Sequence, residues 1–130
     1  MKLLKYIALA AAVTFVQQAA PAAAEDGPTM KAVKQRGHVI CGVNPSRYGF
    51  AAADSKGKWE GLDVDFCRGI AAAVFGDAEK VKFAPLSAVQ RFPALQSGEV
   101  DVLSRTTTIN MNRDVALGFN FGPVTFYTGT

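Results

Sequence analysis

The run Val39-Ile40-Cys41-Gly42-Val43 decides the fold of this 130-residue chain. Its side chains are apolar or absent, so the run predicts a strand with two buried faces, as in parallel sheets that helices cover. Asn44-Pro45-Ser46 follows at once, and these turn-forming residues end the strand abruptly.

The segments around this strand alternate between helical and extended patterns. Apolar residues at spacings of three and four predict helices, and short apolar or alternating runs between turn residues predict strands. In chain order the predicted elements are a helix over 28–36, the strand 39–43, a hairpin from 48–53 and 58–61, a helix over 63–75, a strand over 80–84, a helix over 89–97, a strand over 100–103, a helical turn over 110–113 and strands over 119–121 and 124–127.

This succession of strand, helix, strand, helix and strand predicts an α/β fold with a mainly parallel sheet flanked by helices. In such sheets ligands bind in the crevice outside the carboxyl ends of the strands. Two of the predicted strands end in polar residues, one in Asn44 and the other in the run 104–108. We therefore expect a binding site at this edge.

One helix start is predicted in more detail. Ser87 and Gln90 have the spacing of a capping box. Pro93 would clash with the preceding turn in a helix that began at Ser87, so a start near Val89 is favoured. The residues expected to line the buried face of this helix are Ala88, Phe92 and Leu95.

Three acidic residues lie at predicted helix starts. Asp26 and Asp63 are predicted to cap the helices that follow them. Asp63 and Asp65 could also form a pair for general acid and base catalysis. The favoured interpretation is a plain helix N-terminus, where the helix dipole stabilises acids.

Residues 1–24 have the layout of a secretory signal peptide. A basic start (Lys2 and Lys5) and an apolar run precede Ala22-Ala23-Ala24, a small-residue cleavage site. The alternative is an uncleaved membrane anchor. We expect residues 25–130 to form one exported, periplasmic domain without stable membrane insertion.

The charge balance of this mature segment excludes some partners. The whole chain has a formal net charge of +3, but cleavage removes two lysines and no acid, leaving 12 basic and 11 acidic residues. The remaining charges are scattered, so nothing predicts binding to nucleic acid.

Residues for metal or covalent chemistry are scarce. His38 is the only histidine and has no second ligand nearby, and no glycine-rich phosphate loop occurs. The sequence therefore predicts no catalytic residue, metal or cofactor. Cys41 and Cys67 form either one disulfide or two buried thiols, and both alternatives stay open because their separation in space decides between them.

A recognition surface of hydroxyls, an amide and an arginine remains. Thr106 and Thr108 offer hydrogen bonds at the predicted strand end. Arg113 either clasps a carboxylate with two parallel bonds or is a solvated surface charge.

Four segments together resemble a known family. In order they closely resemble the periplasmic solute-binding proteins of polar and general L-amino-acid ABC transporters, over residues 30–130. The segments are 41–44 (CGVN), 61–68 (GLDVDFCR), 93–102 (PALQSGEVDV) and 106–113 with TTT and Arg113.

The resemblance implies two α/β lobes of the type II periplasmic-binding-protein fold, closing over a free L-amino acid that is passed to the permease of an importer. Arg113 would bind the α-carboxylate, with help from Thr108 and the backbone around Thr106. Asn44 would face the cleft. Members are more than twice this length, so we expect the first lobe alone, with the second lobe absent.

The resemblance is less specific about the residues that would contact the side chain of the bound amino acid. Tyr48 or Phe50 would form an aromatic wall. Ala88 stands where some relatives have a second aromatic wall, which favours a roomier pocket. Arg105 stands where relatives often have a small residue, and it would read an acidic ligand side chain or lie outside the cleft.

Two other functions fit the same resemblance. One is a periplasmic enzyme similar to cyclohexadienyl dehydratase, since a fold does not determine its function. The other is a fragment of a sensor domain.

The signal-peptide pattern gives the first testable prediction. Cleavage after Ala24 should leave Glu25 as the first residue of the exported protein, because the small residues fit the signal-peptidase site. N-terminal sequencing measures this directly. Soluble protein that retains Met1 would contradict it.

Overall fold

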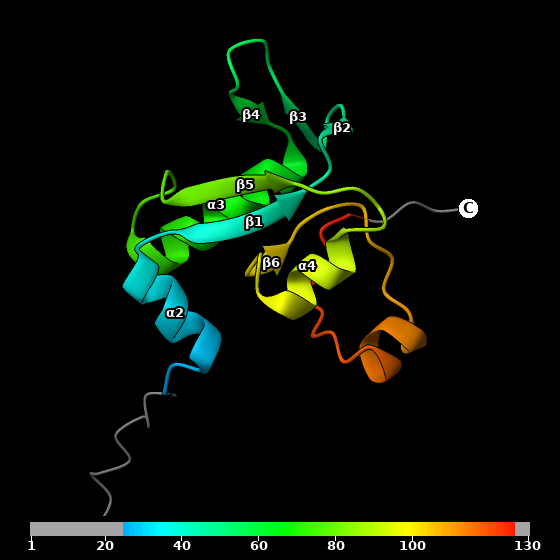
Figure 1. The fold of residues 1–130 in the computed structure, drawn as a ribbon. Coiled ribbons are helices and arrows are strands. Elements are labelled where there is room, and N and C mark those ends of the chain that lie inside the picture. Colours follow the sequence, from blue (N-terminus) through cyan, green and yellow to red (C-terminus); the bar gives the residue numbers. More distant parts are fainter. Residues whose placement is uncertain (1–24, 127–130) are drawn as a thin grey trace, which may run out of the picture.

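The computed structural model describes residues 25–126, and a three-stranded parallel sheet forms their centre (Figure 1). Strand β1 (Val39–Val43) lies between β5 (Val81–Pro85) and β6 (Val102–Leu103). Cys41 is opposite Phe83 on one side and Val102 on the other. The parallel α/β prediction is confirmed.

The two faces of β1 pack against different helices. Cys41 and Val43 are fully buried against α3 (Leu62–Phe75), which contributes Val64 and Cys67. Gly42 faces the other way. A Cβ atom there would lie 2.8 Å from Cδ1 of Leu86, so the absent side chain leaves room for the second core.

The second core consists of Leu86, Ala94 and Val100, which are buried beside β6. Ala94 comes from α4 (Arg91–Ser97). The prediction that Ala88 lines the buried face of this helix is wrong, because Ala88 precedes the first turn and is exposed.

The capping box before α4 is confirmed. The N–H of Ser87 donates to Oε1 of Gln90 at 3.1 Å, and the N–H of Gln90 donates to Oγ of Ser87 at 3.2 Å. The helix then begins at Arg91, later than Ser87 as predicted. Pro93 lies in the first turn, where its missing N–H has no helical acceptor to bond.

Both predicted aspartate caps are wrong. Helix α2 (Pro28–Arg36) starts after Gly27 without a side-chain cap, and Asp26 pairs with Lys34 at 2.7 Å instead. Helix α3 starts after Gly61, so Asp63 lies inside its first turn.

Gly61 has a backbone φ of 125°, and a Cβ atom there would lie 2.4 Å from the Phe50 carbonyl oxygen. Only glycine fits this close approach between the chain and the start of α3.

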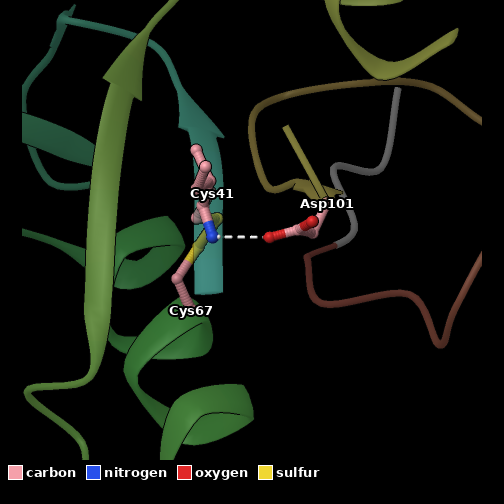
Figure 2. Close-up of a disulfide and its surroundings, with 4 residues drawn as sticks. Cys41, Cys67 and Asp101 are labelled. Carbon is pink, nitrogen blue, oxygen red and sulfur yellow. Dashed lines mark hydrogen bonds between the residues drawn. A yellow bond between two sulfur atoms is a disulfide. The ribbon is translucent and has the colours of Figure 1, made fainter. Parts of the chain in front are cut away.

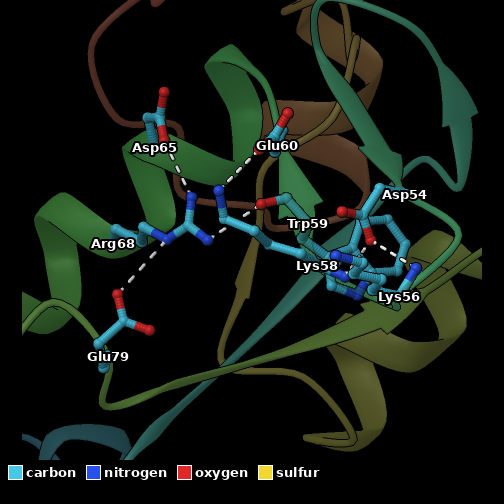
Figure 3. Close-up of polar contacts among 8 residues, drawn as sticks. All are labelled: Asp54, Lys56, Lys58, Trp59, Glu60, Asp65, Arg68 and Glu79. Carbon is cyan, nitrogen blue, oxygen red and sulfur yellow. Dashed lines mark hydrogen bonds and ion pairs between the residues drawn. The ribbon is translucent and has the colours of Figure 1, made fainter.

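The predicted hairpin is present, with one strand more than expected. β3 (Ala51–Ala53) pairs with β4 (Trp59–Glu60), and the added strand β2 (Ser46–Arg47) pairs with β3. In the turn, the Asp54 carboxylate accepts N–H bonds from Lys56 and Lys58, each at 2.8 Å (Figure 3).

The segment after β6 is mostly irregular. A π-helical turn spans Asn112–Ala116, and Oδ1 of Asn110 accepts the Arg113 N–H at 3.0 Å. The predicted strands over 119–121 and 124–127 are wrong as far as residue 126, because this backbone joins no ladder. Tyr127 lies outside the described residues.

Cys41 and Cys67 are joined by a disulfide, so the structure has the first of the two alternatives (Figure 2). Their α-carbons are 6.2 Å apart and both side chains are fully buried. The bond ties the middle of β1 to α3.

Removing this bond should destabilise the fold. Replacing both cysteines with alanine should lower the free energy of unfolding by about 3 kcal/mol, since the disulfide closes a loop with a sequence separation of 26. Denaturant titration measures the loss. Thiol titration of the unreduced, denatured protein is the control, and two free thiols would contradict the bond.

Candidate functional site

Main-chain bonds bring three chain segments to the carboxyl edge of the sheet. The N–H of Ser104 donates to the Gly42 carbonyl at 3.0 Å, and the N–H of Leu86 donates to the Val43 carbonyl at 3.0 Å. The segments that follow β1, β5 and β6 therefore start side by side. This edge is the place where the sequence predicts a site.

Arg113 is held at this edge by two contacts. One terminal nitrogen donates to the Thr108 carbonyl oxygen at 2.5 Å, and its Cζ atom lies 5.2 Å from the centre of the Phe92 ring. Phe119 stacks on the same ring at 4.9 Å and is buried. The structure thus joins the Arg113 side chain to the main chain of Thr108.

Arg91 is a site residue that the sequence reasoning missed. Its Cζ atom lies 4.6 Å from the centre of the Phe92 ring, and it donates to Oγ1 of Thr107 at 3.2 Å. Burial, and then the guanidiniums of Arg105 and Arg113, hold the pKa of Arg91 below its ordinary value. The one signal in the sequence is its place directly after the capping box.

Arg105 is the third arginine of this group. It donates to the Ser87 carbonyl at 3.1 Å. Burial lowers its pKa, the Asp63 charge acts in the opposite direction, and Arg47 lowers it further. We call Arg91, Arg105 and Arg113 the arginine cluster.

Asp63 is the acid beside this cluster. It is 4% exposed, and its Oδ2 atom has no hydrogen-bond partner among the described residues. Burial raises its pKa above the ordinary value of 3.8, while Arg105 and the Ser104 hydroxyl act to lower it. Its N–H donates to the Phe50 carbonyl at 2.9 Å.

The other predicted site residues are spread out. Oδ1 of Asn44 accepts the Ser46 N–H at 3.2 Å, and Thr106 is exposed. The Phe50 ring meets Phe126 edge-on at 5.0 Å. Tyr48 is 88% exposed and lines a shallow hollow on the hairpin.

Within residues 25–126, no three His, Cys, Asp or Glu side chains gather in a group that could hold a metal ion. No helix in this part of the chain has the length and apolar character needed to cross a membrane.

Comparison with known proteins identifies the family. The family model for bacterial extracellular solute-binding proteins, family 3, matches residues 39–128, more than half of the chain. The chain belongs to this family. It is 56% identical over 121 residues to the general L-amino acid-binding periplasmic protein AapJ of Rhizobium johnstonii. That match covers 93% of this chain and 36% of the relative, so the chain spans about a third of its length.

Solved structures of similar proteins support the fold. A Brucella ovis ABC transporter periplasmic binding protein with glutathione bound is 55% identical, with a TM-score of 0.69 over 72% of this chain and 29% of that one. An ancestral amino acid-binding protein, described as a precursor of cyclohexadienyl dehydratase, is 28% identical, with a TM-score of 0.61 over 66% and 37%. The expected periplasmic-binding-protein fold is confirmed.

The raised pKa of Asp63 predicts a pH-dependent stability. An acid whose pKa is raised in the folded state contributes stability that is fully present below its unfolded pKa and is lost as the pH rises through its folded pKa. Asp63→Asn should therefore be more stable than the parent at neutral pH, with a difference that grows from acidic to neutral pH.

Denaturant titration of both proteins across this range measures the difference. Asp65→Asn is the control, since Asp65 is exposed and pairs with Arg68 at 3.1 Å. A difference that shrinks as the pH rises would contradict the prediction.

Proposed function

We propose that this protein binds free L-amino acids in the periplasm and delivers them to the membrane permease of an ABC importer. Residues 1–24 direct export, and residues 25–130 form the first lobe of the binding domain. Family membership and the periplasmic amino-acid-binding relative support this proposal.

The observation that carries the proposal is Arg113 at the carboxyl edge of the sheet. A guanidinium has five N–H donors in a fixed plane, and the Thr108 carbonyl accepts from one terminal nitrogen. The opposite side of the fork suits the two oxygens of an α-carboxylate. Phe92 lies beside the guanidinium, and this contact reduces the ordering needed on binding.

The arginine cluster adds to this preference. Three guanidiniums near one buried acid leave an excess of positive charge, and burial, followed by the charges of Arg105 and Arg113, lowers the pKa of Arg91. A carboxylate ligand relieves this repulsion. A neutral ligand of the same shape does not.

We propose binding rather than catalysis as the role of the site. The relatives reported above are named as binding proteins, although one is described as the precursor of a dehydratase. Mass spectrometry of a ligand before and after prolonged incubation tests this point. A ligand recovered unchanged supports binding, and a dehydrated product favours the enzyme.

Arg113→Ala in the whole protein should weaken amino-acid binding by about 2–5 kcal/mol, or from about 30-fold to several thousand-fold, since it leaves a carboxylate without its charged partner. Arg113→Lys should recover only part of this loss, because an ammonium lacks the planar fork. Calorimetry measures both affinities.

The matched control is Arg68→Ala. Arg68 also lies near an aromatic ring, with Cζ 5.7 Å from the centre of Phe83, but its side chain donates to Asp65 and to the Trp59 carbonyl (Figure 3). Its affinity should stay close to that of the parent, once circular dichroism shows that the variant is folded. Parent-like binding by Arg113→Ala would overturn the assignment.

A further inference from the structure

Asp63 and Ser104 are the buried polar side chains in the described part of the chain, with exposures of 4% and 6%. They come from different elements, since Asp63 lies in the first turn of α3 and Ser104 directly follows β6. Both lie at the carboxyl edge that carries the arginine cluster. A buried charge without full hydrogen bonding destabilises a protein, so its presence calls for an explanation.

Main-chain contacts hold the first turn of α3, which carries Asp63. The N–H groups of Leu62 and Asp63 donate to the carbonyls of Gly49 and Phe50 at 3.0 and 2.9 Å. One turn further along α3, the disulfide at Cys67 ties the helix to β1. The backbone of Asp63 is therefore fixed where the helix starts.

Positive charges outnumber negative charges around Asp63. Arg105 is the cation whose charge acts on the Asp63 carboxylate, and Arg105 and Arg113 in turn act on Arg91. Oδ2 of Asp63 and the Nε atoms of Arg91 and Arg105 are buried without a hydrogen-bond partner among the described residues. Asp63 thus offsets part of the positive charge of the arginine cluster, and it does so through Arg105.

We propose that Asp63 is a specificity-determining residue of this site: its buried negative charge offsets Arg105 and limits the preference for a ligand with a second carboxylate over one with a neutral side chain. This inference rests on the proposed amino-acid binding. It assigns Arg113 to the α-carboxylate, and Arg105 with Asp63 to the discrimination of the ligand side chain.

The size of the effect follows from Coulomb's law. We take the two charges to be the Asp63 carboxylate and a second carboxylate on the ligand. At a separation of about 8 Å and an effective dielectric constant of about 20, their repulsion lowers the binding constant by about 30-fold. Solvent in the site screens part of this interaction. We therefore expect a change of about tenfold in the ratio of affinities for a charged and a neutral ligand.

The test compares glutamate with glutamine, and aspartate with asparagine, because each pair has nearly the same shape and differs by one charge. Calorimetry on the whole protein at neutral pH gives the affinity ratio within each pair. Asp63→Asn should shift this ratio about tenfold toward the acidic amino acid, because the variant removes the offsetting charge and keeps the side-chain shape.

Asp65→Asn is the matched control. It removes the same charge from the same helix two positions later, where the side chain is exposed and pairs with Arg68. Its ratio should stay within about twofold of the parent, since a solvent-exposed charge is screened.

Arg105→Gln supplies a second, opposite test that holds even if Asp63→Asn fails to fold. Removing the cation leaves Asp63 without its offset, so the ratio should shift toward glutamine and asparagine. A merely structural role for Asp63 would weaken both members of a pair equally and leave the ratio unchanged.

The outcomes separate this inference from the proposed function. A parent protein that binds none of the four amino acids overturns the proposed function and the inference with it. A parent that binds them, with ratios in Asp63→Asn and Arg105→Gln that match Asp65→Asn, overturns the inference alone. Opposite shifts in the two variants support it.

Discussion

Strand β1 is held in three directions, by ladders to β5 and β6 at its two edges and by the Cys41–Cys67 disulfide to α3 on one face. Because both ladders are parallel, the chain leaves all three strands at the same edge. The disulfide then fixes the helix whose first turn carries Asp63. The positions of the site residues all depend on this one strand.

The arginine cluster and Asp63 place several charged side chains at this partly buried edge of the sheet. The Phe92 ring lies beside Arg91 and Arg113, and the Phe119 ring stacks on it. The aromatic face attracts both cations, which partly offsets their mutual repulsion. The negative charge of Asp63 offsets this repulsion further, because it acts on Arg105. The cluster is therefore suited to an anionic ligand that satisfies donors which the protein leaves without partners.

Patterns within short segments predicted much of this arrangement, and contacts between segments account for the errors. The central strand, the hairpin turn and the capping box at Ser87 each depend on neighbouring residues, so their spacing predicted them. The predicted cap at Asp63 was wrong because the approach of the Phe50 carbonyl to Gly61 starts the helix earlier. The predicted strands after residue 118 were wrong because a strand needs a partner, which the sequence does not show.

The sequence by itself determined the parallel α/β class, and it singled out the edge where a site is expected and Arg113 as a carboxylate-binding candidate, since these follow from local patterns and from resemblance. Only the tertiary structure brought Arg91 and Asp63 into the site. Arg91 is 22 residues before Arg113 in the chain, and the two meet at a ring that α4 positions. The electrostatic interactions of each charged group depend on distances across the fold, and spacing along the chain does not give these distances.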